Sequence, residues 1–135
     1  MLKSFEFSFS NDYQKLQLEA KVSEPDLIYK VQEAQGVKGV KATEEWQIYS
    51  GDAALWLKEF IDLNILNWDS SYSKTSISGE SEDKLPQWKL SVQEDEESEL
   101  PTQKIIGLNS YPEDFPEFLE LIRKLLGLPY LILEV

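Results

Sequence analysis

The sequence predicts an α+β fold in which two amphipathic helices pack against a twisted, mostly antiparallel sheet of five to seven strands. Three observations lead to this prediction. Apolar and polar residues alternate in several short segments, which is the pattern of strands with one buried face. Short turns separate the first of these segments, so neighbouring strands should run antiparallel. Two longer segments, about 44–63 and 113–126, carry apolar residues every three or four positions, as amphipathic helices do.

The N-terminal third predicts a meander of strands. Three phenylalanines at 5, 7 and 9 alternate with polar residues, and the same alternation returns twice after turn-forming segments. Ser23–Asp26 is one such turn, with Pro25 at its second position. The expected strands are Phe5–Phe9, Leu16–Val22, Leu27–Val31 and a short one near Val37–Lys41.

The first helix is expected over about 44–63. Its apolar stripe consists of Trp46, Tyr49, Ala53, Trp56, Phe60 and Leu63. Thr43 is a suitable N-cap, because its hydroxyl can accept from a free amide of the first turn. Gly51 lies inside the segment and costs about 1 kcal/mol relative to Ala, so a kink or two shorter helices remain open as alternatives.

The second half predicts a further strand around Ile65–Tyr72, a polar loop over Ser70–Lys84 and then a hairpin. Trp88, Leu90 and Val92 alternate in its first strand, and Gln103–Leu108 forms its second. The turn between them is acidic. The helix over about 113–126 follows, and Leu131–Val135 is a possible last strand.

The helix at 113–126 has consistent signals at both ends. Its apolar stripe consists of Phe115, Phe118, Leu119, Ile122, Leu125 and Leu126. Acidic residues lie at its start, Arg123 and Lys124 lie near its end, and Gly127 follows, as the helix dipole and C-terminal capping favour. No linker or repeat divides the chain, so residues 1–135 are expected to form one domain.

The composition narrows the classes of function. The chain has 135 residues and a formal net charge of −12, and it contains neither Cys nor His. These absences exclude disulfides, thiolate nucleophiles and His-based triads. No apolar run approaches the ~20 residues that span a bilayer, and the alternating N-terminus does not resemble a signal peptide. We therefore expect a cytoplasmic protein with no membrane association, no cofactor and no metal.

The negative charge predicts a basic protein partner. Residues 68–135 carry 14 acidic and 6 basic side chains, so the surplus is larger in the second half. Such a surface repels nucleic acid and anionic membranes and attracts basic proteins. The candidate partner-binding residues are those of the acidic turn and one nearby aromatic anchor: Glu94, Asp95, Glu96, Glu97, Glu99 and Trp88. That the acidity only keeps the protein in solution remains an alternative.

Carboxylates are the side chains of this sequence that could form a catalytic or metal site. Carboxylate pairs can perform acid–base chemistry, and four carboxylates lie near aromatic residues in the sequence: Asp52, Glu59, Asp62 and Asp69. The pattern favours the solvated side of the first helix for them. The acidic turn lacks the spaced ligands and central Gly of an EF-hand loop, and no Gly-rich phosphate loop is present.

Part of the chain resembles a group of small uncharacterised domains of low-GC Gram-positive bacteria. Four pieces carry the resemblance: Trp56…Phe60…Leu63 in a helix, Trp68…Tyr72, Gln87-Trp88 in a strand, and Gly107-Leu108-Asn109-Ser110-Tyr111-Pro112 before a Phe-rich helix. The resemblance implies an α+β fold and brings no established activity. Domains of this general kind often accompany toxin or mobile-element genes.

Together these features predict a non-enzymatic protein-binding module. Its most concrete form is a bacterial immunity protein that neutralises a basic toxin domain. One alternative is an acidic protein, encoded by a phage or mobile element, that inhibits a host nuclease by imitating nucleic acid. A second alternative is an enzyme that works through carboxylates.

Overall fold

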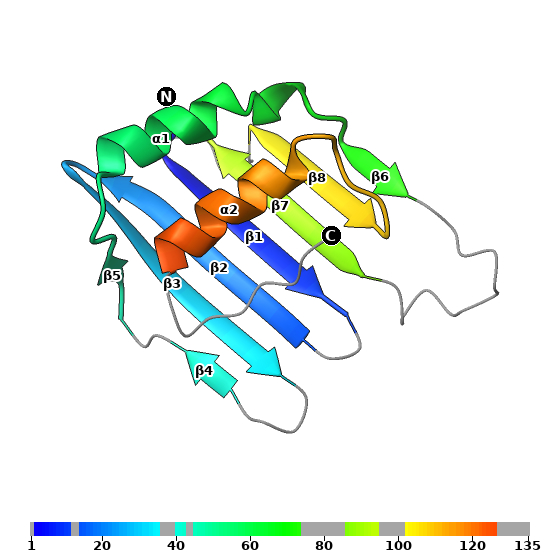
Figure 1. The fold of residues 1–135 in the computed structure, drawn as a ribbon, viewed down its shortest axis with the longest axis horizontal. Coiled ribbons are helices and arrows are strands. Elements are labelled where there is room, and N and C mark those ends of the chain that lie inside the picture. Colours follow the sequence, from blue (N-terminus) through cyan, green and yellow to red (C-terminus); the bar gives the residue numbers. More distant parts are fainter. Residues whose placement is uncertain are drawn as a thin grey trace.

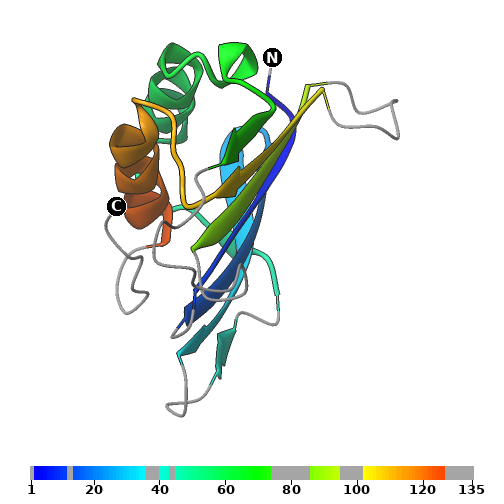
Figure 2. The ribbon, with the colours of Figure 1, turned by 90° about the vertical axis from the view of Figure 1, so that its right-hand side faces the viewer.

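A computed structural model describes residues 2–11, 14–35, 40–42, 45–73, 86–94 and 102–126. It shows the predicted α+β architecture: a mostly antiparallel sheet with two α-helices (Figure 1). Both helices lie against the same face of the sheet, and the other face is not covered by any described helix (Figure 2). This one-sided layering leaves a broad strand surface open.

Seven strands form the main path of the sheet, in the order β4-β3-β2-β1-β7-β8-β6, and an eighth strand, β5, pairs with β3 outside that path. The strands are β1 (Ser4–Ser10), β2 (Gln14–Ser23), β3 (Asp26–Gln35), β4 (Val40–Ala42), β5 (Gln47–Ile48), β6 (Ser71–Ser73), β7 (Gln87–Gln93) and β8 (Gln103–Leu108). The pairing of β6 with β8 is parallel, and the other pairings are antiparallel.

The sequence alternation decides which face of each strand is buried. Phe5, Phe7 and Phe9 of β1 point into the core, and their antiparallel partners on β2 and β7 are also buried. Phe7, for example, lies opposite Leu18 on one side and Leu90 on the other. Because the side-chain period of a strand is two, every intervening residue faces the open side. The expected hairpin strands β7 and β8 are confirmed.

The first helix differs from the prediction. α1 spans Ala53–Asp62, and Asp52 is its N-cap, with the side chain accepting from the Leu55 amide at 3.1 Å. The predicted start near residue 44 is wrong, because β5 occupies 47–48 and pairs with β3 there. Thr43, the predicted cap, lies outside the described residues. Gly51 therefore precedes the helix and does not kink it.

The end of α1 follows from local chemistry. Asn64 adopts the left-handed conformation (φ 58°, ψ 42°), which Asn tolerates and which commonly terminates helices. A 3-10 turn, η2 (Ile65–Asn67), follows directly and precedes β6. The strand expected around Ile65–Tyr72 is thus shortened to Ser71–Ser73. The predicted final strand, most of the polar loop and the acidic turn beyond Glu94 lie outside the described residues.

The second helix, α2 (Phe115–Leu126), is confirmed with its predicted stripe buried and with residues 113 and 114 forming a turn before it. α2 and α1 meet through Trp56, whose indole N–H donates to the carbonyl of Leu121 at 2.8 Å. Trp56 also stacks on Phe5 of the sheet, with ring centroids 5.8 Å apart. One aromatic cluster therefore joins both helices to the central strand.

Candidate functional site: two interaction surfaces

The predicted acidic site is described only at its first residue. Glu94 follows β7 directly, and its backbone N–H donates to the Thr102 hydroxyl at 3.0 Å, which links the two chain segments beyond the β7–β8 pair. Asp95, Glu96, Glu97 and Glu99 lie outside the described residues. Glu94 therefore marks where the acidic run leaves the sheet.

Trp88 is a core residue, and its predicted role as a surface anchor needs correction. Its side chain is 1% exposed, and its indole N–H donates to the carbonyl of Ser110 at 2.9 Å. Its ring packs against Phe115, with centroids 4.7 Å apart. Trp88 also lies at the start of β7, whereas Glu94 follows the end of that strand. A partner at the acidic turn cannot contact this ring without rearranging the core.

An apolar crevice lies beside Glu94 instead. It has a volume of about 110 Å³ and is lined by Leu2, Phe60, Ile61, Asn64, Ile65, Leu66, Val92 and Glu94. Its buried wall comes from the core, but Ile61 and Leu66 are 58% and 41% exposed. Ile61 belongs to α1 and Leu66 to η2, on either side of the left-handed residue Asn64. The crevice is large enough for one aliphatic side chain of a partner.

The four carboxylates weighed for catalysis have separate places in the structure. Asp52 caps α1, and Glu59 forms an ion pair with Lys124 of α2 at 3.3 Å. Asp62 and Asp69 are exposed near the end of α1 and after η2. Within the described ranges no group of three or more acidic, His or Cys side chains is placed to hold a metal ion.

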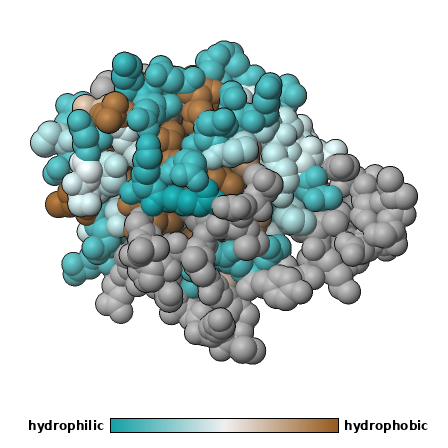
Figure 3. All heavy atoms as spheres, in the orientation of Figure 1, coloured by the Kyte–Doolittle hydropathy of each residue, from teal (hydrophilic) through white to brown (hydrophobic). Residues whose placement is uncertain are grey.

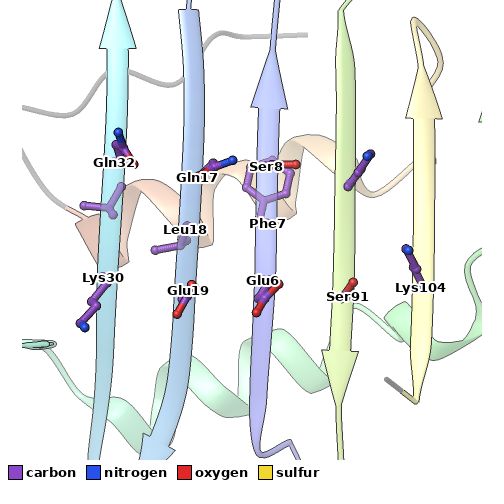
Figure 4. Close-up of a pocket in the computed structure, with 12 residues that line it drawn as sticks. Glu6, Phe7, Ser8, Gln17, Leu18, Glu19, Lys30, Gln32, Ser91 and Lys104 are labelled. Carbon is purple, nitrogen blue, oxygen red and sulfur yellow. The ribbon is translucent and has the colours of Figure 1, made fainter. Parts of the chain in front are cut away.

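A hollow lies on the open face of the sheet. It has a volume of about 480 Å³ and crosses five neighbouring strands, β3-β2-β1-β7-β8 (Figure 4). A row of side chains that are cross-strand neighbours runs through it: Lys30, Glu19, Glu6, Ser91 and Lys104. A second row beside it consists of Gln32, Gln17, Ser8 and Lys89. The short Ser8 and Ser91 near its middle and the longer side chains around them account for the hollow.

The charges of this open face differ from those of the rest of the molecule. It carries five of the 13 basic side chains (Lys15, Lys21, Lys30, Lys89 and Lys104) but only Glu6, Glu19 and Asp26 of the 25 acidic ones. Among described residues the ion pairs are Arg123–Glu120 and Lys124–Glu59, so none of these eight groups forms an ion pair there. Glu6 and Glu19 lie directly opposite each other, an arrangement that like charges disfavour.

Trp46 belongs to this open face and not to the helical stripe in which the sequence placed it. The amino groups of Lys21 and Lys30 lie 4.5 Å and 5.1 Å from the centroid of its ring. Ile48, two residues later in β5, is 63% exposed and pairs with Ile28 of β3. The ring and the two lysines form a cation–π cluster at one side of the hollow.

Among the described residues, one titratable group has a shifted pKa. Tyr111, in the connection between β8 and α2, stacks against Trp88 with centroids 6.4 Å apart. Burial raises the pKa of its hydroxyl above the ordinary value of 10.0. This shift reflects packing beside the core, because its cause is desolvation by burial.

The sequence contained the signal for the open face. Each strand predicted from alternation has a polar set, and the lysines belong to those sets on β2, β3, β7 and β8. Their gathering on one surface depends on the strand order, in which the β7–β8 pair lies beside β1 and across from β2. Sequence alternation cannot reveal that order, so the surface could not be assembled from the sequence.

Neither the described helices nor a comparison with known proteins assigns a function. None of the described helices has the length and apolar character needed to cross a bilayer. No protein-family model matches the chain, and neither a curated protein nor a solved structure matches it.

Proposed function

We propose that this protein is a non-enzymatic protein-binding module, most concretely an immunity protein that neutralises a basic toxin domain. The observation that carries the proposal is the apolar crevice that ends at Glu94. It brings the exposed Ile61 and Leu66 next to the residue at which the acidic run of the sequence begins. An apolar anchor site bordered by negative charge suits a partner that presents an aliphatic side chain next to Lys or Arg.

The acidic side chains and the apolar crevice would act on different steps of binding. Acidic side chains at the rim of an interface act mainly on association, because their field steers a basic partner before contact. An aliphatic side chain buried in the crevice acts mainly on dissociation, because apolar area is removed from water only in the complex. The helix-bearing face is otherwise mostly hydrophilic, with hydrophobic residues visible in patches between the polar ones (Figure 3).

Two other functions remain as alternatives. An acidic inhibitor that imitates nucleic acid uses the same charge surplus but has no need for an apolar crevice. An enzyme working through carboxylates would most simply use Glu6 and Glu19, which face each other on the sheet. Both are exposed, however, so their surroundings do not distinguish a general acid from a general base.

A kinetic experiment tests the proposal. Glu94, Asp95, Glu96 and Glu97 are changed together to Gln or Asn, and association with a candidate basic toxin domain is followed at low and high salt. We expect association to slow by about tenfold at low salt and its salt dependence to flatten. The matched control neutralises four exposed, dispersed acids (Glu24, Glu45, Asp69 and Glu117), which removes the same charge elsewhere.

A second pair of variants tests the crevice. Leu66→Ser should speed dissociation, whereas Leu55→Ser, at an exposed position of α1 that does not line the crevice, should leave dissociation unchanged. Equal rates for wild type and both test variants would exclude this surface. Hydrolysis or transfer catalysed by the protein and lost in Glu6→Gln would favour the enzyme instead.

A further inference from the structure

The open face of the sheet is a second interaction surface, opposite in charge to the first. It carries a local charge of +2 from five lysines, two glutamates and Asp26 on a chain whose net charge is −12. Lysines on edge strands commonly prevent strand pairing. Here Lys15 and Lys21 lie on β2 and Lys89 lies on β7, which are interior strands with neighbours on both sides. Edge protection therefore does not explain them.

The arrangement of charge is ordered as well as positive. Along the row in the hollow, Lys30 and Lys104 occupy the two ends, and Glu19 and Glu6 lie between them (Figure 4). Four inter-strand steps separate β3 from β8, which places the two lysine backbones about 19 Å apart. The row thus reads positive, negative, negative, neutral and positive from one rim to the other.

This order excludes several kinds of occupant. Nucleic acid and anionic membranes present uninterrupted negative charge, which Glu6 and Glu19 repel at the middle of the row. A second copy docked face to face on a two-fold axis would place positive faces against each other and Lys30 against Lys30 or Lys104. A protein segment whose acidic residues flank a basic one matches the row at each position.

We infer that the open sheet face binds an extended protein segment with an acidic residue at each end and a basic residue at its centre. The acidic ends contact Lys30 and Lys104, and the basic centre contacts Glu6 and Glu19. About six residue steps of extended chain cover the 19 Å between the lysines. Apolar residues flanking the segment meet Trp46 and Ile48 at one rim and Ile106, which is 45% exposed, near the other.

This inference goes beyond the proposed function, because it uses different residues, the opposite face and the opposite charge. The probe is a synthetic peptide of about seven residues, with Glu at both ends, Lys at the centre and Gly or Ser elsewhere. Binding to the full chain is followed by amide chemical shifts up to about 5 mM peptide. We expect shifts confined to β1, β2, β3, β7 and β8, and at least tenfold weaker binding by a peptide of the same composition with the three charges adjacent.

Two double variants and a matched control sharpen the test. Lys30→Glu with Lys104→Glu should reduce affinity for the probe at least tenfold, whereas Lys58→Glu with Lys124→Glu makes the same net charge change on the helices and should not. Glu6→Gln with Glu19→Gln should weaken binding of the Lys-centred probe and strengthen binding of one with Glu at its centre. This exchange of preference requires a folded protein, so a loss of folding cannot imitate it.

Several outcomes would overturn the inference. They are the absence of shifts at the highest peptide concentration, shifts outside the open face, and equal binding of the two peptides. Tighter binding of single-stranded RNA or of vesicles rich in anionic lipid would show instead that the lysines recognise continuous negative charge. Failure here leaves the crevice beside Glu94 untouched, because none of the residues substituted here belongs to the acidic run or lines the crevice.

Discussion

Gly107 of β8 leaves space for the Trp88 indole on the neighbouring strand. The two residues are cross-strand partners, and a Cβ added at Gly107 would lie 1.8 Å from Trp88 Nε1. That nitrogen donates to the Ser110 carbonyl, which holds the chain as it leaves β8 for α2. The absence of a side chain at one position thus allows a large ring to occupy the core.

Gly107→Ala should destabilise the protein by about 1–3 kcal/mol, because the indole must move and lose its bond to Ser110. In a Trp88→Phe background the Nε1 atom is absent, so the same substitution should cost less. Urea unfolding followed by circular dichroism measures both costs. If Gly107→Ala costs the same in the two backgrounds, the contact with the indole is not the cause.

At the scale of elements, α1 shows how a sequence pattern can extend a helix too far. Trp46 and Tyr49 continue the spacing of Ala53, Trp56 and Phe60, and the spacing alone does not reveal where the helix begins. Pairing of β5 with β3 keeps residues 47–48 extended and turns Trp46 towards the open face. Asp52 then starts the helix, because its carboxylate accepts from a free amide of the first turn.

Asp52→Ala should therefore cost about 1 kcal/mol of unfolding free energy, and Asp52→Asn should cost much less because its side-chain oxygen also accepts. Asp62→Ala is the matched control at the other end of α1. There a negative charge opposes the helix dipole, so its removal should leave stability unchanged or slightly higher. Thermal unfolding decides between these outcomes, and equal losses for Asp52→Ala and Asp62→Ala would contradict the assignment of the cap.

At the scale of the whole molecule, one core joins both helices to one face of the sheet. Phe118 of α2 packs edge-to-face with Phe7 of β1, with centroids 5.0 Å apart, and Trp56 of α1 stacks on Phe5 two residues away. The opposite face carries none of the described helices, and the polar side chains of the strands lie there. The same alternation along each strand therefore produces the core and the candidate binding surface.

Phe118→Ala and Trp56→Ala should each destabilise the protein by about 3–5 kcal/mol, as truncation of large buried aromatics does. Leu55→Ala, at an exposed position of α1, should stay within about 0.5 kcal/mol of wild type. Chemical denaturation provides the three values. If both aromatic variants had the same free energy of unfolding as Leu55→Ala, the assignment of this core would be wrong.

Local sequence patterns were sufficient to predict most of the main strands and the second helix. Strict alternation predicted β1, β2, β3 and β7, and the apolar stripe predicted α2, because burial on one face demands these periods whatever the partner. β8 was predicted as the partner strand that follows the acidic turn. The candidate site was less accessible from sequence. Charge density pointed to the segment beginning at Glu94, but Trp88, chosen as its anchor, proved to be buried, and Ile61 and Leu66 lie beside Glu94 instead.

The sequence by itself therefore established the α+β class, the face that each main strand buries and the uneven distribution of acidic residues. Contacts between distant residues established the rest. Strand order gathers Lys30, Glu19, Glu6 and Lys104 into one row, and pairing of β5 with β3 sets where α1 begins. The physical reason is that side-chain period is a property of one segment, whereas strand order and helix limits depend on free energies shared between segments far apart in the chain.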